Sequence, residues 1–153
     1  MLTLVESTKL TSVPLCLIVR SDSPLAALPR ISLKAASELP LILLEYGMYV
    51  RGCIEKLAEK NDVRFQPKAE ANNSSLILQM VRTGKWSSIS FPEIIRQIKD
   101  LIAIPIEAQT PLTVSLLWLK GGYRKAAAQE FARIIDGLIK SRDEMPVMNP
   151  QKR

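Results

Sequence analysis

An acid, an aromatic ring and a glycine follow one of the most apolar segments of this chain, and they are its best candidates for binding chemistry. Glu45, Tyr46 and Gly47 come directly after the apolar run 41–44. Ligands of open α/β sheets bind outside the carboxyl ends of the strands, so these residues stand where a cleft would be lined. An exposed loop acid with no ligand is an equally good interpretation of Glu45.

A second group of candidates surrounds the first of the two tryptophans. Trp86 can stack on a ligand, although an indole that enters a strand is more often a core residue. Ser87, Ser88 and Ser90 offer hydroxyl groups to a small anion, or mark the outward positions of a strand. The run 73–75 (Asn-Ser-Ser) suits a helix start, where anion binding and simple capping explain it equally well.

The residues that most catalytic sites need are missing. The chain contains no histidine, so no Ser-His-Asp triad, Cys-His pair or His-ligated metal can form. The glycine-rich phosphate loops and the G-x-S-x-G elbow are also absent, and the carboxylates are dispersed. Cys16 and Cys53 each lie in an apolar segment, which favours buried free thiols over a disulfide. The sequence therefore predicts no enzyme, no metal and no cofactor.

Composition narrows the class of protein further. Of the 153 residues, 47% are hydrophobic and 24% are charged, which is typical of a folded domain and not of a disordered chain. No apolar run approaches the length of a membrane span, and the N-terminus does not resemble a secretory signal. The net charge of +6 comes from scattered residues, and aromatics make up only 5%, so a solvated surface is favoured over a nucleic-acid patch.

Short apolar segments alternate with amphipathic ones along the chain, which predicts an α/β fold with a largely parallel sheet. Strands are expected at 13–19, 41–44, 86–91, 101–106 and 111–119, with a short or edge strand in 63–71. Helices are expected at 49–60, from Asn73 to Gly84, from Pro92 onward, and at 123–140.

The order of these segments resembles the effector-binding domain of LysR-type transcriptional regulators. The matching motifs are 13–19 (VPLCLIV) with 23–26 (SPLA), 31–33 (ISL), 39–45 (LPLILLE), 81–84 (VRTG) with Pro92, and the strand 114–120 with the helix that holds Phe131. The resemblance covers residues 10 to 140. Trp86 stands where the family usually has a second glycine, and Ala35 and Ala36 replace its usual Asp and Leu.

The resemblance implies an α/β fold similar to the type 2 periplasmic-binding proteins, with two lobes of mainly parallel sheets and one lobe incomplete. Residues 1–11 would come from the missing part of lobe I, 12–106 would form the effector-binding lobe II, 107–141 would be the returning strand and helix of lobe I, and 142–153 a loose tail. The two lobes would be hinged near Ile106 and Pro111. No helix-turn-helix fits before Leu10, so DNA would be bound only through a segment that this chain lacks.

The function implied by the resemblance is small-molecule sensing in a cytoplasmic transcription regulator that works as a homodimer or homotetramer. The effector would shift the population of lobe arrangements, and the geometry of the oligomer would follow. The expected effector-binding residues are Leu44, Glu45, Tyr46, Gly47, Ser90, Phe91 and Pro92. A stand-alone solute-binding module of the same fold is the alternative. The incomplete lobe predicts exposed apolar surface and self-association.

Overall fold

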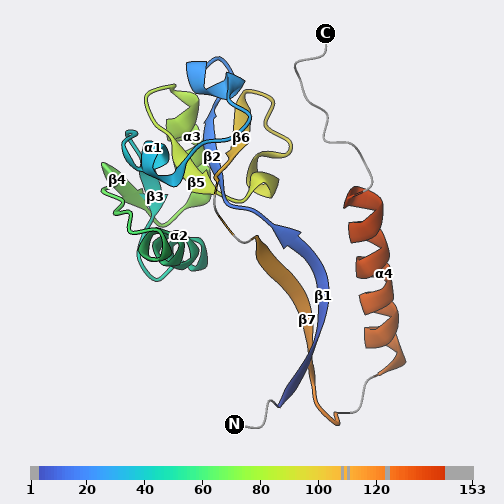
Figure 1. Cartoon of the computed structure of the whole chain (residues 1–153). Helices are drawn as coiled ribbons and strands as arrows, with labels where there is room; N and C mark the ends of the chain where they lie inside the picture. Colours follow the sequence, from blue (N-terminus) through green and yellow to red (C-terminus); the bar gives the residue numbers. More distant parts are fainter. Residues whose placement is uncertain (1–3, 108, 110, 123–124, 144–153) are drawn as a thin grey trace. The chain divides into compact units, whose positions relative to one another are not determined.

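The computed structural model describes residues 4–107, 109, 111–122 and 125–143, and the chain divides into two compact units. Unit 2 is the continuous stretch Val13–Leu112, and unit 1 is made of the two segments Met1–Ser12 and Thr113–Arg153. Figure 1 shows most of the short strands and helices in unit 2, whereas unit 1 holds two long strands and one long helix.

Unit 2 is built on a mixed sheet. Its strands are β2 (Cys16–Arg20), β3 (Ile42–Leu44), β4 (Ala69–Ala71), β5 (Ser88–Ser90) and β6 (Leu101–Pro105). β2 lies between β5 and β6 and is antiparallel to both, while β3 and β4 are parallel. A parallel bridge between Leu41 and Ser87 links the two groups of strands.

The α/β class predicted from the sequence is confirmed, but the expectation of mainly parallel strands needs correction at β2. Cys16, the first residue of β2, pairs with Pro105, the last residue of β6. The chain therefore enters and leaves unit 2 at the same edge of the sheet. A strand that begins where another strand ends must run antiparallel to it, and hydrophobicity alone carries no information on that direction.

Helices cover the sheet, and their ends follow local sequence signals. They are η1 (Pro24–Ala27, a 3₁₀ turn), α1 (Leu33–Ser37), α2 (Tyr49–Lys60), α3 (Ser74–Arg82) and η2 (Pro92–Ile95, also 3₁₀). The Oδ1 atom of Asn73 accepts the backbone N–H groups of Ser75 and Leu76, so the run 73–75 is a helix cap. The predicted helix at 49–60 has the bounds of α2.

The core of unit 2 has two halves, one on each face of the sheet. The α2-side core contains Leu17, Val19 and Ile54, and the α3-side core contains Ile18 and Val81, each almost fully buried. Consecutive residues of β2 thus alternate between the two halves, as the period of two in a strand requires. A strand covered on both faces is apolar throughout, which is why 13–19 reads as a buried strand.

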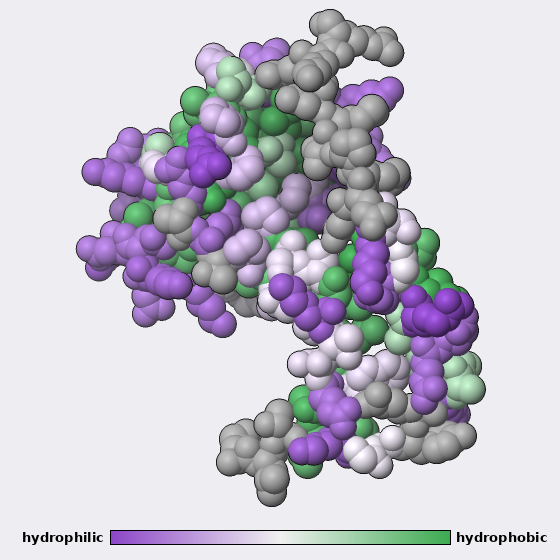
Figure 2. Space-filling view, turned by 45° about the vertical axis from the view of Figure 1, so that its right-hand side comes forward, coloured by the Kyte–Doolittle hydropathy of each residue, from purple (hydrophilic) through white to green (hydrophobic). Residues whose placement is uncertain are grey.

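Unit 1 consists of β1 (Val5–Val13), β7 (Leu112–Leu119) and α4 (Ala126–Asp143). β1 and β7 form a two-stranded sheet and run in opposite directions in Figure 1, and the Lys120 N–H donates to the Leu4 carbonyl at 2.8 Å. None of the described residues of unit 1 is buried. Figure 2 shows hydrophobic residues at the surface in the lower half of the view, among hydrophilic ones.

Several predicted bounds differ from the structure. β1 was not expected, and the strand predicted at 13–19 begins only at Cys16, because Pro14 has no N–H to donate to a neighbouring strand. The strand expected at 86–91 is limited to 88–90, and only 69–71 of the stretch 63–71 forms a strand. The terminal helix runs from 126 to 143, and the rest of the predicted loose tail lies outside the described residues.

Candidate functional site

The carboxyl ends of β3 and β5 lie at the same edge of the unit 2 sheet. The bridge between Leu41 and Ser87 is parallel, so both strands run the same way and end together at Leu44 and Ser90. Cys16 pairs with Ser90, which places the start of β2 at this edge as well. We call the segments 44–48 and 90–92, which follow these two strand ends, the entry edge, because the chain enters and leaves unit 2 there.

The loop after β3 has its backbone fixed and its side chains open to solvent. The Glu45 N–H donates to the Ala71 carbonyl at 3.1 Å, and the Met48 N–H donates to the Glu45 carbonyl at 3.3 Å. Gly47 has a φ of +91°, a conformation that a side chain would strain. Glu45 and Tyr46 are exposed, whereas Leu44 is buried at the end of its strand. The loop thus presents a carboxylate and a phenol from a defined backbone.

Arg51, in the first turn of α2, contacts both the end of β3 and the loop that follows it. Its side chain is 1% exposed, and its Nη1 donates to the Leu44 carbonyl at 3.0 Å and to Glu70 at 2.7 Å. Its Nε donates to Glu55 at 2.6 Å. The Tyr46 ring centroid lies 4.0 Å from the guanidinium carbon, a cation–π contact. One buried cation therefore joins the end of β3, the loop, β4 and α2.

The charge of Arg51 is already matched by its neighbours. Burial lowers the pKa of Arg51, but the hydrogen bonds that Arg51 donates to Glu55 and Glu70 outweigh that effect and hold the pKa above its ordinary value. Arg51 is not among the site residues predicted from the sequence. Its spacing of four residues from Glu55 was a readable signal for a helix ion pair, whereas its contact with Glu70 depends on the fold.

The segment after β5 forms the second half of the entry edge. Ser90 is 8% exposed, and its backbone lies opposite Cys16. Phe91 packs against the α2-side core, and Pro92 begins η2. All seven predicted site residues therefore lie at one edge, but they differ in access to solvent: Glu45, Tyr46 and Gly47 are exposed, Phe91 and Pro92 are half-buried, and Leu44 and Ser90 are buried.

The described part of the chain also contains two cavities whose lining is largely distinct from the entry edge. One, of about 520 Å³, is lined by parts of α2 and the segment 62–66 and includes only Tyr46 of the predicted site residues. The other, of about 270 Å³, has none of them and includes Trp86 and Ser87 in its lining. Trp86 also packs against the α3-side core, in keeping with its reading as a partial core residue.

The two thiols are free and buried, as the sequence predicted. Burial, with a smaller contribution from the charge of Glu93, raises the pKa of Cys16 to about 12, so this thiol stays protonated and unreactive at neutral pH. Among the described residues no cluster of acids and cysteines has the geometry to hold a metal ion. None of the helices described is both long and apolar enough to cross a membrane.

Comparisons with known proteins agree on one family and one fold. The family model for the LysR substrate binding domain matches residues 3–138. The regulatory domain of CcmR from Synechocystis PCC6803, solved in complex with 2-PG, superposes with a TM-score of 0.75 at 20% identity, over 89% of this chain and 67% of that one. The effector binding domain of QuiR in complex with shikimate gives 0.70 at 19% identity, over 90% and 66%.

A longer solved protein contains the same fold. HinK, a LysR family transcriptional regulator from Pseudomonas aeruginosa, superposes with a TM-score of 0.73 at 16% identity, over 89% of this chain and 49% of HinK. This chain thus spans about half to two thirds of the length of these three structures. The likeness confirms the periplasmic-binding-protein-like α/β fold.

Proposed function

This chain belongs to the LysR substrate binding domain family, and we propose that it is the effector-sensing part of a LysR-type transcriptional regulator. Two solved structures of the same fold were determined in complex with small molecules, 2-PG in CcmR and shikimate in QuiR. In this proposal unit 2 corresponds to lobe II of the regulator, and the strands and helix of unit 1 belong to lobe I. The regulatory output is then a shift between lobe arrangements that differ in affinity for the effector.

The observation that carries the proposal is the entry edge. Two strand ends and the segments that follow them meet where unit 2 joins the rest of the chain, which is where ligands bind in sheets of this kind. The loop after β3 is fixed by backbone hydrogen bonds and by Arg51. A preorganised loop lowers the entropy lost on binding, so the arrangement suits recognition of a small molecule.

The charges at the entry edge favour a neutral or cationic effector. Glu45 is exposed at this edge, and the nearby cation, Arg51, is buried and matched by Glu55 and Glu70. An anionic ligand at this loop would meet the carboxylate without a free positive charge among the loop residues. A ligand with an ammonium group would meet both Glu45 and the open face of the Tyr46 ring.

The test is a titration of the full chain with a set of small amines, neutral polyols and carboxylates, followed residue by residue in amide NMR spectra. We expect ligands that bind to shift the resonances of Glu45, Gly47 and Ser90 together. Glu45→Gln should weaken the binding of amines several-fold, because it removes one charge partner from a half-open site. Glu38→Gln, which removes an exposed acid at the end of α1, is the matched control.

Two results would count against the proposal. One is a set of bound ligands whose shifts never include the entry edge. The other is an affinity that stays the same in the Glu45→Gln variant for every ligand that binds. Because Glu45 is exposed, the variant keeps the fold, and a loss of binding can be assigned to the lost carboxylate.

The proposed partners follow from the family. As part of a LysR-type regulator, the chain would act in the cytoplasm within a homodimer or homotetramer, and DNA would be contacted through the helix-turn-helix of that regulator. The exposed apolar residues of unit 1, among them Leu117 and Phe131, support association with further protein surface. Light scattering that shows only monomer at high protein concentration would contradict this part of the proposal.

A further inference from the structure

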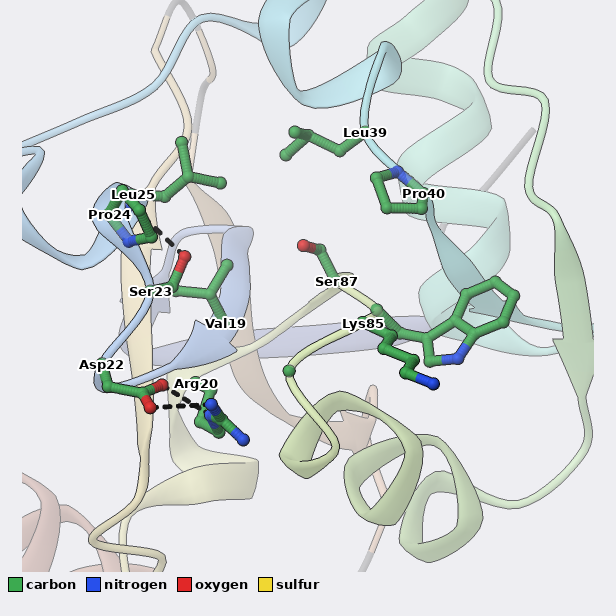
Figure 3. Close-up of a pocket in the computed structure, with 12 residues that line it drawn as sticks. Val19, Arg20, Asp22, Ser23, Pro24, Leu25, Leu39, Pro40, Lys85 and Ser87 are labelled. Atoms are coloured by element: carbon green, nitrogen blue, oxygen red, sulfur yellow. Dashed lines mark hydrogen bonds and ion pairs between the residues drawn. The ribbon is translucent and has the colours of Figure 1, made fainter.

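The cavity of about 270 Å³ lies at the edge of the unit 2 sheet opposite the entry edge. Ile18 of β2 pairs with Ser88 of β5, so the next residues along, Val19 and Ser87, are neighbours in the direction away from Cys16. Both line the cavity (Figure 3). We call it the distal cavity. Its volume lies just below the range for drug-sized ligands and suits a smaller molecule.

The hydroxyl of Ser87 points into the distal cavity. Ser87 is 6% exposed, its N–H donates to the Pro40 carbonyl, and its carbonyl accepts from Ile42. Its Oγ, in contrast, has no hydrogen bond to any residue that the structure describes. Figure 3 shows this oxygen directed into the space between Leu25 and Leu39. The Ser87 residue is buried but its hydroxyl faces the cavity and makes no hydrogen bond within the described protein, so its proton is available to a ligand that supplies an acceptor.

The rest of the lining separates into an apolar wall and a polar rim. Leu25, Leu39 and Pro40 form apolar walls. Ser23 accepts the Leu25 N–H at 3.3 Å through its Oγ, which leaves the Ser23 hydroxyl proton free to donate to a ligand. The site therefore offers hydroxyl donors beside a short apolar surface.

The charge of the rim is positive. Arg20 is paired with Asp22, with contacts of 2.5 and 2.7 Å, and its Nη1 also donates to the Arg82 carbonyl. Gly84, with a φ of +78°, lets this guanidinium pack closely, since a Cβ there would lie 2.8 Å from the guanidinium carbon. The exposed Lys85 has no ion pair with any described residue, so it leaves one uncompensated positive charge at the mouth.

We propose that the distal cavity binds a short-chain carboxylate, with its carboxyl group on the Ser87 and Ser23 hydroxyls near Lys85 and its hydrocarbon tail against Leu25 and Leu39. Each part of such a ligand has a counterpart in the lining: acceptors for the two hydroxyls, negative charge for the lysine, and apolar carbon for the walls. The site lies at the far edge from the proposed effector loop, so it would be a second, separate ligand site on unit 2.

The experiment titrates the full chain with butyrate, n-butanol and n-butylamine at constant ionic strength and follows amide and indole NMR signals. Butyrate should saturate with a dissociation constant on the order of millimolar, as expected for so few ligand atoms, and should shift Ser87, Lys85 and the Trp86 indole. Butanol should bind more weakly, and butylamine should give no saturable shift, because it lacks an acceptor and carries the wrong charge.

Variants identify the groups responsible. Ser87→Ala should weaken butyrate binding about tenfold, the effect of losing one hydrogen bond to a charged group. Ser88→Ala is the matched control, because Ser88 follows Ser87 directly at the start of β5, is also buried and is absent from the lining. Lys85→Gln, at an exposed position that cannot disturb the core, should weaken binding about threefold.

The proposal would be overturned by no saturation with butyrate, by equal binding of butylamine, or by an unchanged butyrate affinity in both the Ser87→Ala and Lys85→Gln variants. Shifts confined to Glu45, Gly47 and Ser90 would also overturn it, because they would place butyrate at the entry edge. A failure of the entry-edge proposal leaves these readouts unaffected, since the two sites share no residue.

Discussion

Unit 2 and unit 1 use apolar residues in opposite ways. In unit 2 the side chains of Leu17, Ile18 and Leu43 are fully or almost fully enclosed, and helices cover both faces of the sheet. In unit 1, Leu117 is 64% exposed and Phe131 is 61% exposed. Both units have regular strands and helices, so the difference lies in packing and not in secondary structure.

The difference shows that strands contribute little stability when no other element packs on their faces. The ribbon of β1 and β7 is a two-stranded sheet, and such ribbons are marginally stable when nothing packs on them. The apolar stripe of α4 includes Phe131, Ile134 and Leu138, yet all three remain exposed among the described residues. Stability should therefore reside in unit 2, and binding sites that need a rigid frame belong there.

Truncating one leucine in each unit is the strongest test of this comparison. Leu17→Ala leaves a cavity in the α2-side core and should lower the free energy of unfolding by about 3–5 kcal/mol. Leu117→Ala, at an exposed site, should change it by less than about 0.5 kcal/mol. Urea unfolding of both variants can be followed by far-UV circular dichroism, which reports on the strands and helices of both units. Equal losses in the two variants would mean that unit 1 has a core of its own.

Ion pairs give a second contrast between the units, with a smaller expected difference in the free energy of unfolding. Arg51 in unit 2 is buried between Glu55 and Glu70, and Arg133 in unit 1 pairs with Glu130 on the open surface of α4. Arg51→Met should cost about 2–3 kcal/mol, because it removes a buried cation from Glu55, Glu70 and the Leu44 carbonyl at once. Arg133→Met should cost less than about 0.5 kcal/mol.

The same urea titrations measure both arginine variants. High salt sharpens the contrast, since it should remove what little the Arg133 pair contributes and leave the cost of Arg51→Met nearly unchanged. If Arg51→Met proved as mild as Arg133→Met, the view that Arg51 anchors the loop after β3 would be wrong.

The sequence predicted those features that depend on neighbouring residues. The helix at 49–60, the Asn73 cap and the α/β class all follow from periodicity and side-chain chemistry over short stretches. β1 was not predicted because its residues are mostly polar and exposed, so it lacks the apolar alternation that marks a half-buried strand. The antiparallel direction of β2 was not predicted because it depends on the pairing of β2 with β6, some 90 residues later in the chain.

The candidate site was predictable to the same extent. Strand ends at 44 and 90 identified the entry edge, because the carboxyl ends of parallel strands share one edge of a sheet. The role of Arg51 could not be predicted from the sequence, since its hydrogen bond to Glu70 joins residues 19 positions apart through the pairing of β3 with β4. The distal cavity could not be predicted for the same reason, because Val19 and Ser87 become neighbours only through the pairing of β2 with β5.

The third contrast is in pH dependence, and it is the smallest. The pKa of Cys16 rises from 9.0 to about 12 in the folded chain, chiefly through burial, and unit 1 contains no cysteine. The neutral thiol is thus favoured by folding, and its contribution is complete below pH 9 and declines as the pH rises toward 12. By about pH 10 the unfolded chain gains about 1.4 kcal/mol from ionising this thiol, and the folded chain gains almost nothing.

The free energy of unfolding of the natural chain and of Cys16→Ala should therefore converge by that amount between about pH 8 and about pH 10, because every other group titrates in both proteins alike. Urea unfolding at several pH values in this range measures the gap. The variant is less stable by a constant amount for its lost side chain, and only the pH-dependent part reports on the thiol. Parallel curves would show that Cys16 reaches solvent in the folded state, and would weaken the contrast between an enclosed unit 2 and an open unit 1.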